Sequence, residues 1–324
     1  NVEFKIVKQI DININVVPTF PLFGLFDPAL GMTTIVPDMN PTKPAQADPR
    51  RLIAAIRQFG VTNLFGSPAL LDTLTRYTHE NGMRFSGLKR VLSAGAPVGR
   101  EVLKKVRRML PDAADLFTPY GATECLPVAS IAGTELLDET IAERNRSGGG
   151  VCVGRPLDDN QVKIIAVTDE VICGLDEITE VPTGEIGEIV VLGPTTSQGY
   201  YARPKANAYS KIDDATSARK FHRMGDLGYF DVEGRLWFCG RKAHRIVQSN
   251  GFVCAVPVEQ VINQHPDVFR SAVVDGGDGQ VVAVLEFESG ASLTEAREAE
   301  IKRLCEMHLP QVGIERFFEH PGFP

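Results

Sequence analysis

Several short blocks of this sequence place glycine beside aromatic, hydroxyl and charged side chains, the groups that can hold a ligand against a turn of the chain. In Ser93-Ala94-Gly95-Ala96-Pro97 the side chains are small, so the backbone could closely approach a planar ring. Thr118-Pro119-Tyr120-Gly121-Ala122-Thr123-Glu124 brings an aromatic ring, a hydroxyl and a carboxylate to the end of a predicted strand. Further blocks follow in the order Thr183-Gly184-Glu185-Ile186-Gly187-Glu188-Ile189, Gly199-Tyr200-Tyr201, Met224-Gly225-Asp226-Leu227-Gly228 and Gly240-Arg241-Lys242.

Each of these residues also has a purely structural explanation when it is taken alone. Tyr120 could be a core aromatic residue, and Glu124 could be a carboxylate at a helix start, where the helix dipole favours it. Asp226 could be a turn residue, and Arg241 a partner in a surface ion pair. His222 is expected to be a packed strand residue rather than a base.

Common signatures of other enzyme classes are absent. The sequence contains no GxxxxGK[ST] loop, no GxGxxG after a strand and no GxSxG. It therefore does not support a P-loop enzyme, a simple dinucleotide-binding protein or an α/β-hydrolase. Asp275-Gly276-Gly277-Asp278-Gly279 lacks the ligand spacing and terminal glutamate of a calcium loop, and we expect it to be a hairpin turn.

The composition is that of a globular protein. Its 324 residues suggest two domains, and 43% are hydrophobic and 23% charged, which excludes intrinsic disorder and a fibrous protein. The 34 basic and 41 acidic residues give a net charge of −7, so a nucleic-acid partner is not expected. The apolar run 16–26 is too short to span a bilayer and contains Pro18 and Pro21.

The cysteines are too far apart in the sequence for a zinc or redox motif. Because no CxxC pair occurs, we expect buried, reduced thiols in a cytoplasmic protein without a secretory signal. The cysteines are Cys125, Cys152, Cys173, Cys239, Cys254 and Cys305.

The elements around the first two blocks alternate between helix and strand. Ser67 is expected to cap a helix whose first residue is Pro68 and which ends near Gly82. Such βαβ units build a parallel sheet, in which ligands bind outside the carboxyl ends of the strands. The other expected elements are helices at 50–59 and 100–110, and strands at 61–65, at 90–93 and ending at 118–120.

From residue 151 the pattern changes to short strands with glycine turns, expected at 162–167, 187–192, 228–230 and 235–239. We expect a small barrel or a pair of curved sheets there. A small α+β domain follows, with a helix at 257–264, strands at 268–274 and 280–288, and a helix from 293. Ser292 and Glu295 would form the capping box of that last helix. The predicted domains are thus 1–150, 151–240 and 241–324.

The order of the blocks resembles that of the adenylate-forming superfamily, which includes acyl- and aryl-CoA synthetases, luciferases and the adenylation domains of peptide synthetases. The resemblance implies a mixed α/β and α+β multidomain fold. It would consist of part of a large domain, with a parallel βαβ sheet and a β-rich subdomain, followed by a small mobile C-terminal domain. It also implies ATP or AMP and Mg²⁺ as the bound cofactors.

The resemblance assigns a role to individual residues. Gly95, Ala96 and Pro97 would line one face of the adenine, and Tyr120, followed by Gly121, would stack on the other. Thr123 would bond to the α-phosphate, and Glu124 would hold Mg²⁺, a cation that prefers oxygen ligands. Asp226 would accept hydrogen bonds from both ribose hydroxyls, and Arg241 would reach the ribose and phosphate. Thr123, Glu124 and Arg241 are therefore the predicted catalytic residues.

A narrower resemblance is to the bacterial β-lactone synthetases of olefin biosynthesis. It rests on residues 17–31, 41–49, 120–128 and 236–242, and on Pro21, where most acyl-CoA synthetases have histidine. Such enzymes adenylate a long-chain β-hydroxy fatty acid, whose hydroxyl then expels AMP and closes a β-lactone without an external thiol. Other enzymes of olefin biosynthesis (a thiolase, a reductase and a decarboxylase) would be its partners.

The sequence departs from the superfamily pattern at three places. The phosphate loop that precedes the position of Asn1 and the lysine-bearing end of the small domain are missing, and Ala243 stands at a hinge where many relatives have Asp or Lys. Gly251 matches the glycine of a loop that moves into the site for the second half-reaction. We expect residues 1–324 to bind AMP without catalysing pyrophosphate exchange. An acyl-CoA or acyl-carrier synthetase, and a nucleotide-binding fragment without catalysis, are the alternatives.

Overall fold

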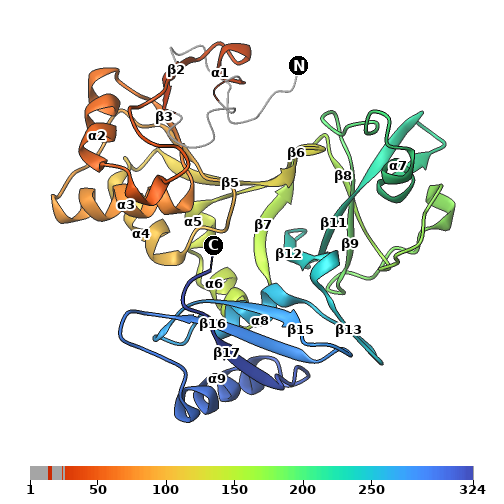
Figure 1. The fold of residues 1–324 in the computed structure, drawn as a ribbon. Helices are drawn as coiled ribbons and strands as arrows, with labels where there is room; N and C mark the ends of the chain where they lie inside the picture. The colour runs from red at the N-terminus through yellow and green to blue at the C-terminus, as the bar shows by residue number, and fades with distance from the viewer. Residues whose placement is uncertain (1–13, 17–23, 25, 324) are drawn as a thin grey trace. The chain divides into compact units, whose positions relative to one another are not determined.

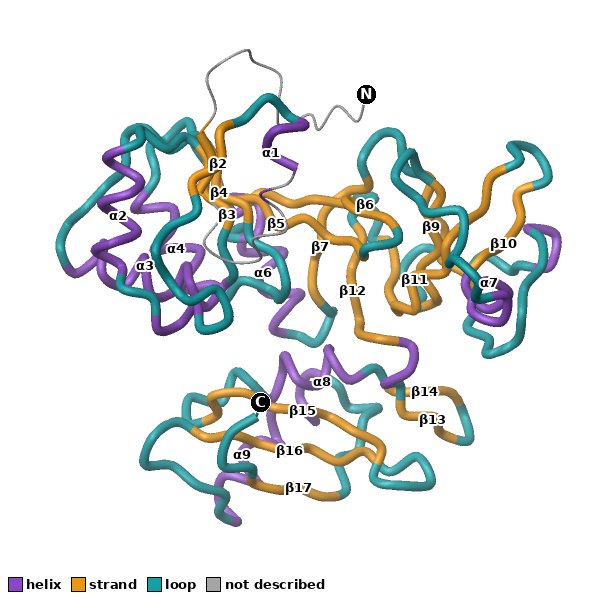
Figure 2. The backbone as a smooth tube through the Cα atoms, turned by 45° about the horizontal axis from the view of Figure 1, so that its top comes forward, coloured by secondary structure: helices purple, strands orange, loops and turns teal. Residues whose placement is uncertain are grey.

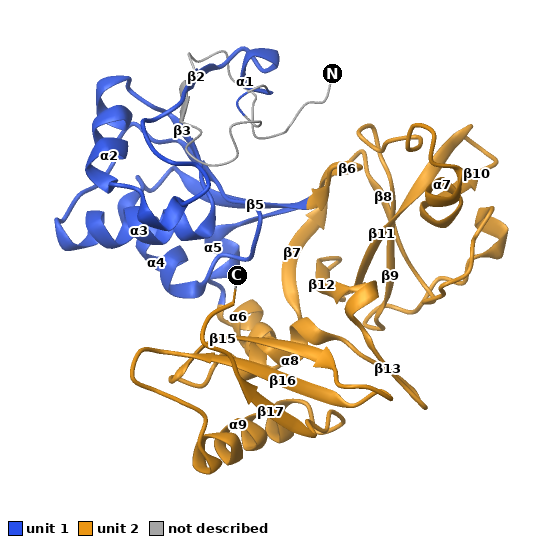
Figure 3. Cartoon of the chain, viewed as in Figure 1, with its two compact units in different colours: residues 1–120, 129–138 blue, residues 121–128, 139–324 orange. Residues whose placement is uncertain are grey.

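The computed structural model describes residues 14–16, 24 and 26–323 (Figure 1). The chain divides into two compact units, shown in different colours in Figure 3. Unit 1 comprises residues 1–120 and 129–138, and unit 2 comprises residues 121–128 and 139–324. The expected domain boundaries after residues 150 and 240 both fall inside unit 2 and stay predictions.

Unit 1 contains the expected parallel sheet, with strand order β2-β1-β3-β4-β5. Its strands are β1 (Ile14–Val16), β2 (Thr33–Ile35), β3 (Asn63–Phe65), β4 (Arg90–Leu92) and β5 (Asp115–Ala122). Its helices are α1 (Phe26–Ala29), η3 (Pro44–Gln46), α2 (Pro49–Gln58), α3 (Pro68–Glu80), α4 (Arg100–Met109) and α5 (Gly133–Leu136). Leu71 of α3 and Val91 of β4 are fully buried in the core that these helices share with the sheet.

Local signals set the ends of the helices in unit 1. The Ser67 hydroxyl accepts a hydrogen bond from the backbone N–H of Leu70, so the predicted cap of α3 is confirmed. Asp48 caps α2 in the same way, with Pro49 at the first helical position. Gly60, just after α2, has a φ of +59°, a conformation that glycine adopts without a steric penalty.

Strand β5 is longer than we expected, and a second strand follows it. The chain stays extended to Ala122, turns at Thr123 and Glu124, and continues as β6 (Cys125–Ala132). A Cβ atom at Gly121 would lie 2.6 Å from the carbonyl oxygen of Cys125, so only glycine allows this close approach across the turn. The turn thus presents Thr123 and Glu124 between two strands.

Unit 2 contains an antiparallel sheet in the order β7-β12-β11-β9-β8, with β10 also paired to β11. This single sheet replaces the small barrel or pair of curved sheets that we expected. Its strands are β7 (Val151–Pro156), β8 (Gln161–Ile165), β9 (Gly187–Leu192), β10 (Lys211–Asp214), β11 (Arg219–Phe230) and β12 (Leu236–Arg241). The helices before and between them are α6 (Glu139–Arg146), η4 (Leu175–Glu177) and α7 (Pro204–Ser210).

The last part of unit 2 is the expected α+β arrangement. Figure 2 shows β15 (Val268–Asp275), β16 (Val281–Phe287) and β17 (Arg316–Glu319) as one small sheet. The helices α8 (Ala255–Ile262) and α9 (Glu295–His308) share its core. The remaining elements are η5 (Lys242–His244), β13 (Ile246–Gln248) and β14 (Gly251–Val253). Residues 275–279 join the antiparallel strands β15 and β16, which confirms the hairpin turn.

Two local predictions are wrong. Helix α9 is capped by Thr294, whose hydroxyl accepts from the N–H of Arg297, and not by Ser292 with Glu295. The reason is that the chain stays extended through Thr294, and the residue directly before the helix is the one that can cap it. All six cysteines are free, but Cys173 is exposed because it lies in the loop between β8 and β9.

Among the helices of the described residues, none has the length and the apolar character that a membrane span requires.

Candidate functional site

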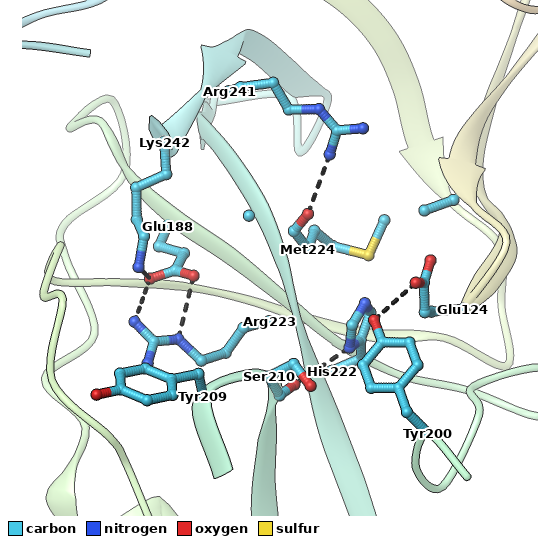
Figure 4. Close-up of a pocket in the computed structure, with 12 residues that line it drawn as sticks. Glu124, Glu188, Tyr200, Tyr209, Ser210, His222, Arg223, Met224, Arg241 and Lys242 are labelled. Carbon is cyan, nitrogen blue, oxygen red and sulfur yellow. Dashed lines mark hydrogen bonds and ion pairs between the residues drawn. The ribbon is translucent and has the colours of Figure 1, made fainter. Parts of the chain in front are cut away.

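A pocket of about 330 Å³ lies in unit 2 (Figure 4). Strand β11 contributes the largest share of the lining. The rest comes from the end of β5 and the turn after it, strand β9, the segment from Tyr200 to Ser210, the end of β12 and the start of η5. Of the predicted site residues, it brings together Glu124 and Arg241. Its lining consists of Ala122, Glu124, Glu188, Tyr200, Tyr209, Ser210, His222, Arg223, Met224, Gly225, Arg241 and Lys242.

Glu124 is held in the pocket by Tyr200. The Tyr200 hydroxyl donates to Glu124 Oε1 at 2.6 Å, and the backbone N–H of Ser197 donates to the Glu124 carbonyl at 2.8 Å. The Tyr200 hydrogen bond keeps the pKa of the Glu124 carboxyl below its ordinary value. Glu124 is therefore a carboxylate in a turn between two strands, and the alternative of a helix-start residue is wrong.

Tyr200 is itself fixed from two sides. The Asn207 side chain accepts from the Tyr200 backbone N–H at 2.6 Å and donates to its carbonyl at 3.0 Å. Lys211 Nζ lies 5.7 Å from the centre of the Tyr200 ring. Burial, and then the bond to Glu124, raise the pKa of Tyr200 to about 12, so it remains a donor. The Gly199-Tyr200-Tyr201 block pointed to this residue, but the sequence did not reveal its role.

Replacing Tyr200 with phenylalanine should raise the pKa of the Glu124 carboxyl, because its largest stabilising hydrogen bond is lost. Carbon-13 NMR titration of the Glu124 carboxyl carbon measures this shift, and the protonated form should appear at higher pH than in the wild type. Tyr209→Phe is the matched control, since Tyr209 lines the same pocket without a hydrogen bond to Glu124. An unchanged Glu124 titration in Tyr200→Phe would contradict the role of Tyr200.

Asp226 and Arg241 form an ion pair across two adjacent strands. They are register partners on β11 and β12, and Arg241 Nη1 donates to Asp226 Oδ1 at 2.9 Å. Asp226 is buried within a strand, so the alternative of an ordinary turn residue is wrong. The Arg241 side chain is 54% exposed, which leaves part of its guanidinium facing solvent. Arg241 is thus an ion-pair partner, as one alternative proposed, and it also lines the pocket.

A buried charged network forms another wall of the pocket. Arg223 Nε and Nη2 donate to both carboxylate oxygens of Glu188, at 3.1 and 2.7 Å, and both side chains are almost fully buried. Lys242 Nζ lies 3.1 Å from Glu188 Oε2. Arg223 and Lys242 also donate to the carbonyl of Thr168, at 2.6 and 2.8 Å. The sequence signal that we missed is opposite charges in otherwise buried strands, which require pairing.

His222 is the packed strand residue that we expected, and it also lines the pocket. Its Nδ1 lies 3.1 Å from the carbonyl oxygen of Ser210. Lys211, its register partner on β10, is also buried and donates to the carbonyl and hydroxyl oxygens of Ser197 at 2.5 and 3.0 Å. Burial lowers the pKa of Lys211 below its ordinary value.

The other predicted site residues do not line this pocket. Gly95, Ala96 and Pro97 are exposed in unit 1 after β4, and Gly95 has a φ of +97°. Tyr120 is half-buried in β5, so the alternative of a core aromatic residue is wrong, and Thr123 lies in the turn beside Glu124. Gly251 begins β14, and Ala243 lies in η5. Pro21 lies outside the described residues.

Comparison with known proteins identifies relatives across nearly the whole chain. The chain is 45% identical over 315 residues to an olefin beta-lactone synthetase of Xanthomonas campestris pv. campestris, and 46% over 313 residues to one of Stenotrophomonas maltophilia. Each match covers 95% of this chain, which spans 56% of the length of either relative. A long-chain-fatty-acid–CoA ligase of Escherichia coli is 27% identical over 75% of this chain and 39% of its own.

Solved structures confirm the predicted fold class. The amide bond synthetase McbA from Marinactinospora thermotolerans superposes with a TM-score of 0.74 at 24% identity, over 98% of this chain and 60% of its own. The O-succinylbenzoate coenzyme A synthetase MenE from Bacillus subtilis, in complex with ATP and magnesium ion, gives 0.74 at 22% identity, over the same shares. The AMP-binding enzyme family matches residues 17–201, more than half of the chain. The family match over residues 17–201, the identity to the relatives and the match to solved folds agree with the order of the sequence blocks. The chain therefore belongs to the AMP-binding enzyme family.

Proposed function

We propose that the protein containing this chain is an ATP-dependent, AMP-forming acid ligase that closes a long-chain 3-hydroxy fatty acid to a β-lactone in olefin biosynthesis. The observation that carries the proposal is the 45–46% identity to two olefin beta-lactone synthetases over 95% of this chain. Identity to the long-chain-fatty-acid–CoA ligase is only 27%. That ligase supports a second candidate, a fatty acyl-CoA synthetase.

We further propose that the nucleotide lies against the predicted residues. Asp226 would accept the ribose hydroxyls, and Arg241, already paired with it and partly exposed, would contact the ribose and the phosphate. The exposed backbone after β4 would receive the adenine. The remaining adenine and phosphate contacts would come from Gly95, Ala96, Pro97, Tyr120, Gly121 and Thr123.

The chemistry of the pocket fits a magnesium ion beside Glu124. The lowered pKa of Glu124 keeps it a carboxylate, the kind of hard oxygen ligand that Mg²⁺ prefers. Among the described residues there is no group of three or more His, Cys, Asp and Glu side chains that could hold a metal. Glu124 would therefore be one ligand beside phosphate oxygens and water, and the ion would supply charge neutralisation at the phosphate.

In the proposed reaction, the chain holds the reacting groups in place and stabilises charge. The carboxylate of the acid attacks the α-phosphate, which releases pyrophosphate and leaves the acid activated as a mixed anhydride. The 3-hydroxyl then attacks the acyl carbon and releases its proton to water, the bond from that carbon to the phosphate oxygen breaks, and AMP leaves with the electron pair. A hydroxyl held beside the carbonyl can reach an effective molarity on the order of 10⁵ M or more, so no external thiol is required.

The products decide between the two candidates. The full-length protein is incubated with ATP, Mg²⁺ and a 3-hydroxy fatty acid with a long 2-alkyl branch, with and without CoA, and the products are analysed by mass spectrometry. We expect AMP and a β-lactone in both reactions. Acyl-CoA as the sole product, formed only when CoA is added, would favour the second candidate.

Replacing Asp226 with alanine is expected to weaken AMP binding by about 1.5–3 kcal/mol, the range for hydrogen bonds to a charged group. Adenine alone should lose much less, because it has no ribose. Isothermal titration calorimetry with both ligands measures the difference. Asp213→Ala, which removes an exposed carboxylate on β10 that is paired with Lys220, is the control and should leave AMP binding unchanged. Equal losses for AMP and adenine would mean that Asp226 does not contact the sugar.

A further inference from the structure

The imidazole of His222 has one nitrogen with a partner and one without. Its Nδ1 lies 3.1 Å from the carbonyl oxygen of Ser210. A carbonyl oxygen can only accept a hydrogen bond, so Nδ1 must carry the proton. In the neutral ring, Nε2 is then a bare acceptor. In Figure 4 the ring lies against Ser210 on one edge and faces the Glu124 side of the pocket with the other.

The ring is neutral at physiological pH. The His222 residue is 3% exposed, and Lys211 is its direct neighbour on β10. Burial first, and the charge of Lys211 second, lower the pKa of His222 to about 4. The unprotonated form with a free lone pair on Nε2 is therefore the form that a ligand meets.

Three donors that line the pocket, on Tyr200, Ser210 and Arg223, are engaged elsewhere. The Tyr200 hydroxyl donates to Glu124, and the Ser210 hydroxyl donates to the carbonyl of Ala206 at 2.8 Å. Arg223 donates to Glu188 and to backbone carbonyls. Across residues 14–16, 24 and 26–323, no hydrogen bond reaches His222 Nε2. An acceptor on a buried residue that faces a pocket and has no donor partner is a place for a ligand's N–H or O–H group.

The chemistry of the proposed substrates limits which group this is. Carboxylates and phosphates are ionised at neutral pH and cannot donate. The remaining donors are the adenine amino group, whose proposed place is the exposed backbone after β4, and the hydroxyls, which belong either to the ribose or to the acid. Asp226 is the carboxylate proposed for the ribose, and it is already turned toward Arg241 on the neighbouring strand.

We infer that His222 Nε2 accepts a hydrogen bond from the 3-hydroxyl of the acid substrate and thereby selects 3-hydroxy acids over acids that lack this group; the inference rests on the proposed lactone-forming function. His222 is then a specificity residue that holds the attacking hydroxyl in place. A site that hydrogen-bonds a substrate hydroxyl discriminates strongly against the analogue without it, because the buried polar group is left unpaired.

The test compares two acids of equal length, one with and one without the 3-hydroxyl, in the full-length protein. His222→Phe keeps a flat ring but removes the acceptor, whereas His222→Gln can present a carbonyl oxygen near the position of Nε2. Tyr209→Phe is the matched pocket control. For each variant, pyrophosphate exchange gives KM and kcat for both acids, mass spectrometry gives the lactone, and thermal melting confirms that the variant is folded.

We expect His222→Phe to raise KM for the 3-hydroxy acid about tenfold, with a similar loss of lactone, the effect of one unmade hydrogen bond to a buried group. KM for the acid without the hydroxyl should change less than about twofold. His222→Gln should retain most of the preference for the 3-hydroxy acid. Equal losses for both acids would overturn the inference. A loss whose size differs between ATP and 2′-deoxy-ATP would also overturn the inference, because His222 would then accept from a ribose hydroxyl and not from the acid.

The wild-type protein separates this inference from the function on which it rests. A wild type that makes only acyl-CoA overturns the proposed lactone synthesis. A wild type that makes the lactone, together with a His222→Phe variant of unchanged acid preference, overturns the role of His222 alone.

Discussion

Replacing Glu188 with leucine is expected to lower the free energy of unfolding by about 3–5 kcal/mol, the cost of removing one partner from a buried ion pair. Glu188 and Arg223 have side-chain exposures of 1% and 2%, and Lys242 also bonds to Glu188. Without the carboxylate, the Arg223 guanidinium stays buried and keeps the backbone carbonyls of Glu170 and Thr168 as acceptors. Desolvation of that charge would no longer be compensated.

Urea denaturation measures this effect, with the fluorescence of Trp237 as the probe. Trp237 is the chain's one tryptophan and is fully buried in β12 of the same sheet. Glu298→Leu is the control: it pairs with Lys302 one turn later on α9, both side chains are far more exposed than those of Glu188 and Arg223, and the loss should stay below about 1 kcal/mol. The double variant Glu188→Leu/Arg223→Met should recover much of the stability, since apolar replacements of similar size avoid the buried charge. Equal losses for Glu188→Leu and Glu298→Leu would contradict this explanation.

Replacing Glu124 with glutamine is expected to reduce ATP–pyrophosphate exchange by the full-length protein about 10²–10³-fold, the usual effect of removing one group that stabilises transition-state charge. Glutamine preserves the shape of the side chain and can still accept the Tyr200 hydrogen bond. What it lacks is the negative charge that would hold Mg²⁺ against the phosphate.

The dependence on magnesium distinguishes a metal ligand from a structural residue. In Glu124→Gln, exchange should require a higher Mg²⁺ concentration, while the melting temperature stays close to that of the wild type. Glu170→Gln is the control, because Glu170 is an exposed carboxylate near the same sheet. An unchanged magnesium requirement together with an unchanged rate would show that Glu124 does not bind the ion.

Much of the fold could be predicted from the sequence because its signals are local. Ser67 followed by Pro68 predicted the start of α3, and Gly60 predicted the end of α2. The alternation of helices and strands predicted the parallel sheet of unit 1. The order of the glycine-containing blocks predicted the family, since each block is a contiguous run of residues that can be read without knowledge of its neighbours in space.

Strand β11 and the cap of α9 show where the local patterns fail. His222, Arg223 and Asp226 interrupt the apolar pattern of β11, so only its last residues were predicted as strand. Ser292 and Thr294 can both cap a helix, and the backbone conformation at Thr294 decides which one does.

The sequence by itself determined the family, the order of the elements and the candidate residues Glu124, Asp226 and Arg241. Only the tertiary structure decided their partners, since an ion pair or a hydrogen bond between strands depends on register. Tyr200 meets Glu124 from 76 residues away, and Arg223 meets Glu188 from 35 residues away. The free acceptor on His222 likewise exists because β10 and α7 bring Ser210 and Lys211 against β11, a packing that no contiguous stretch of residues specifies.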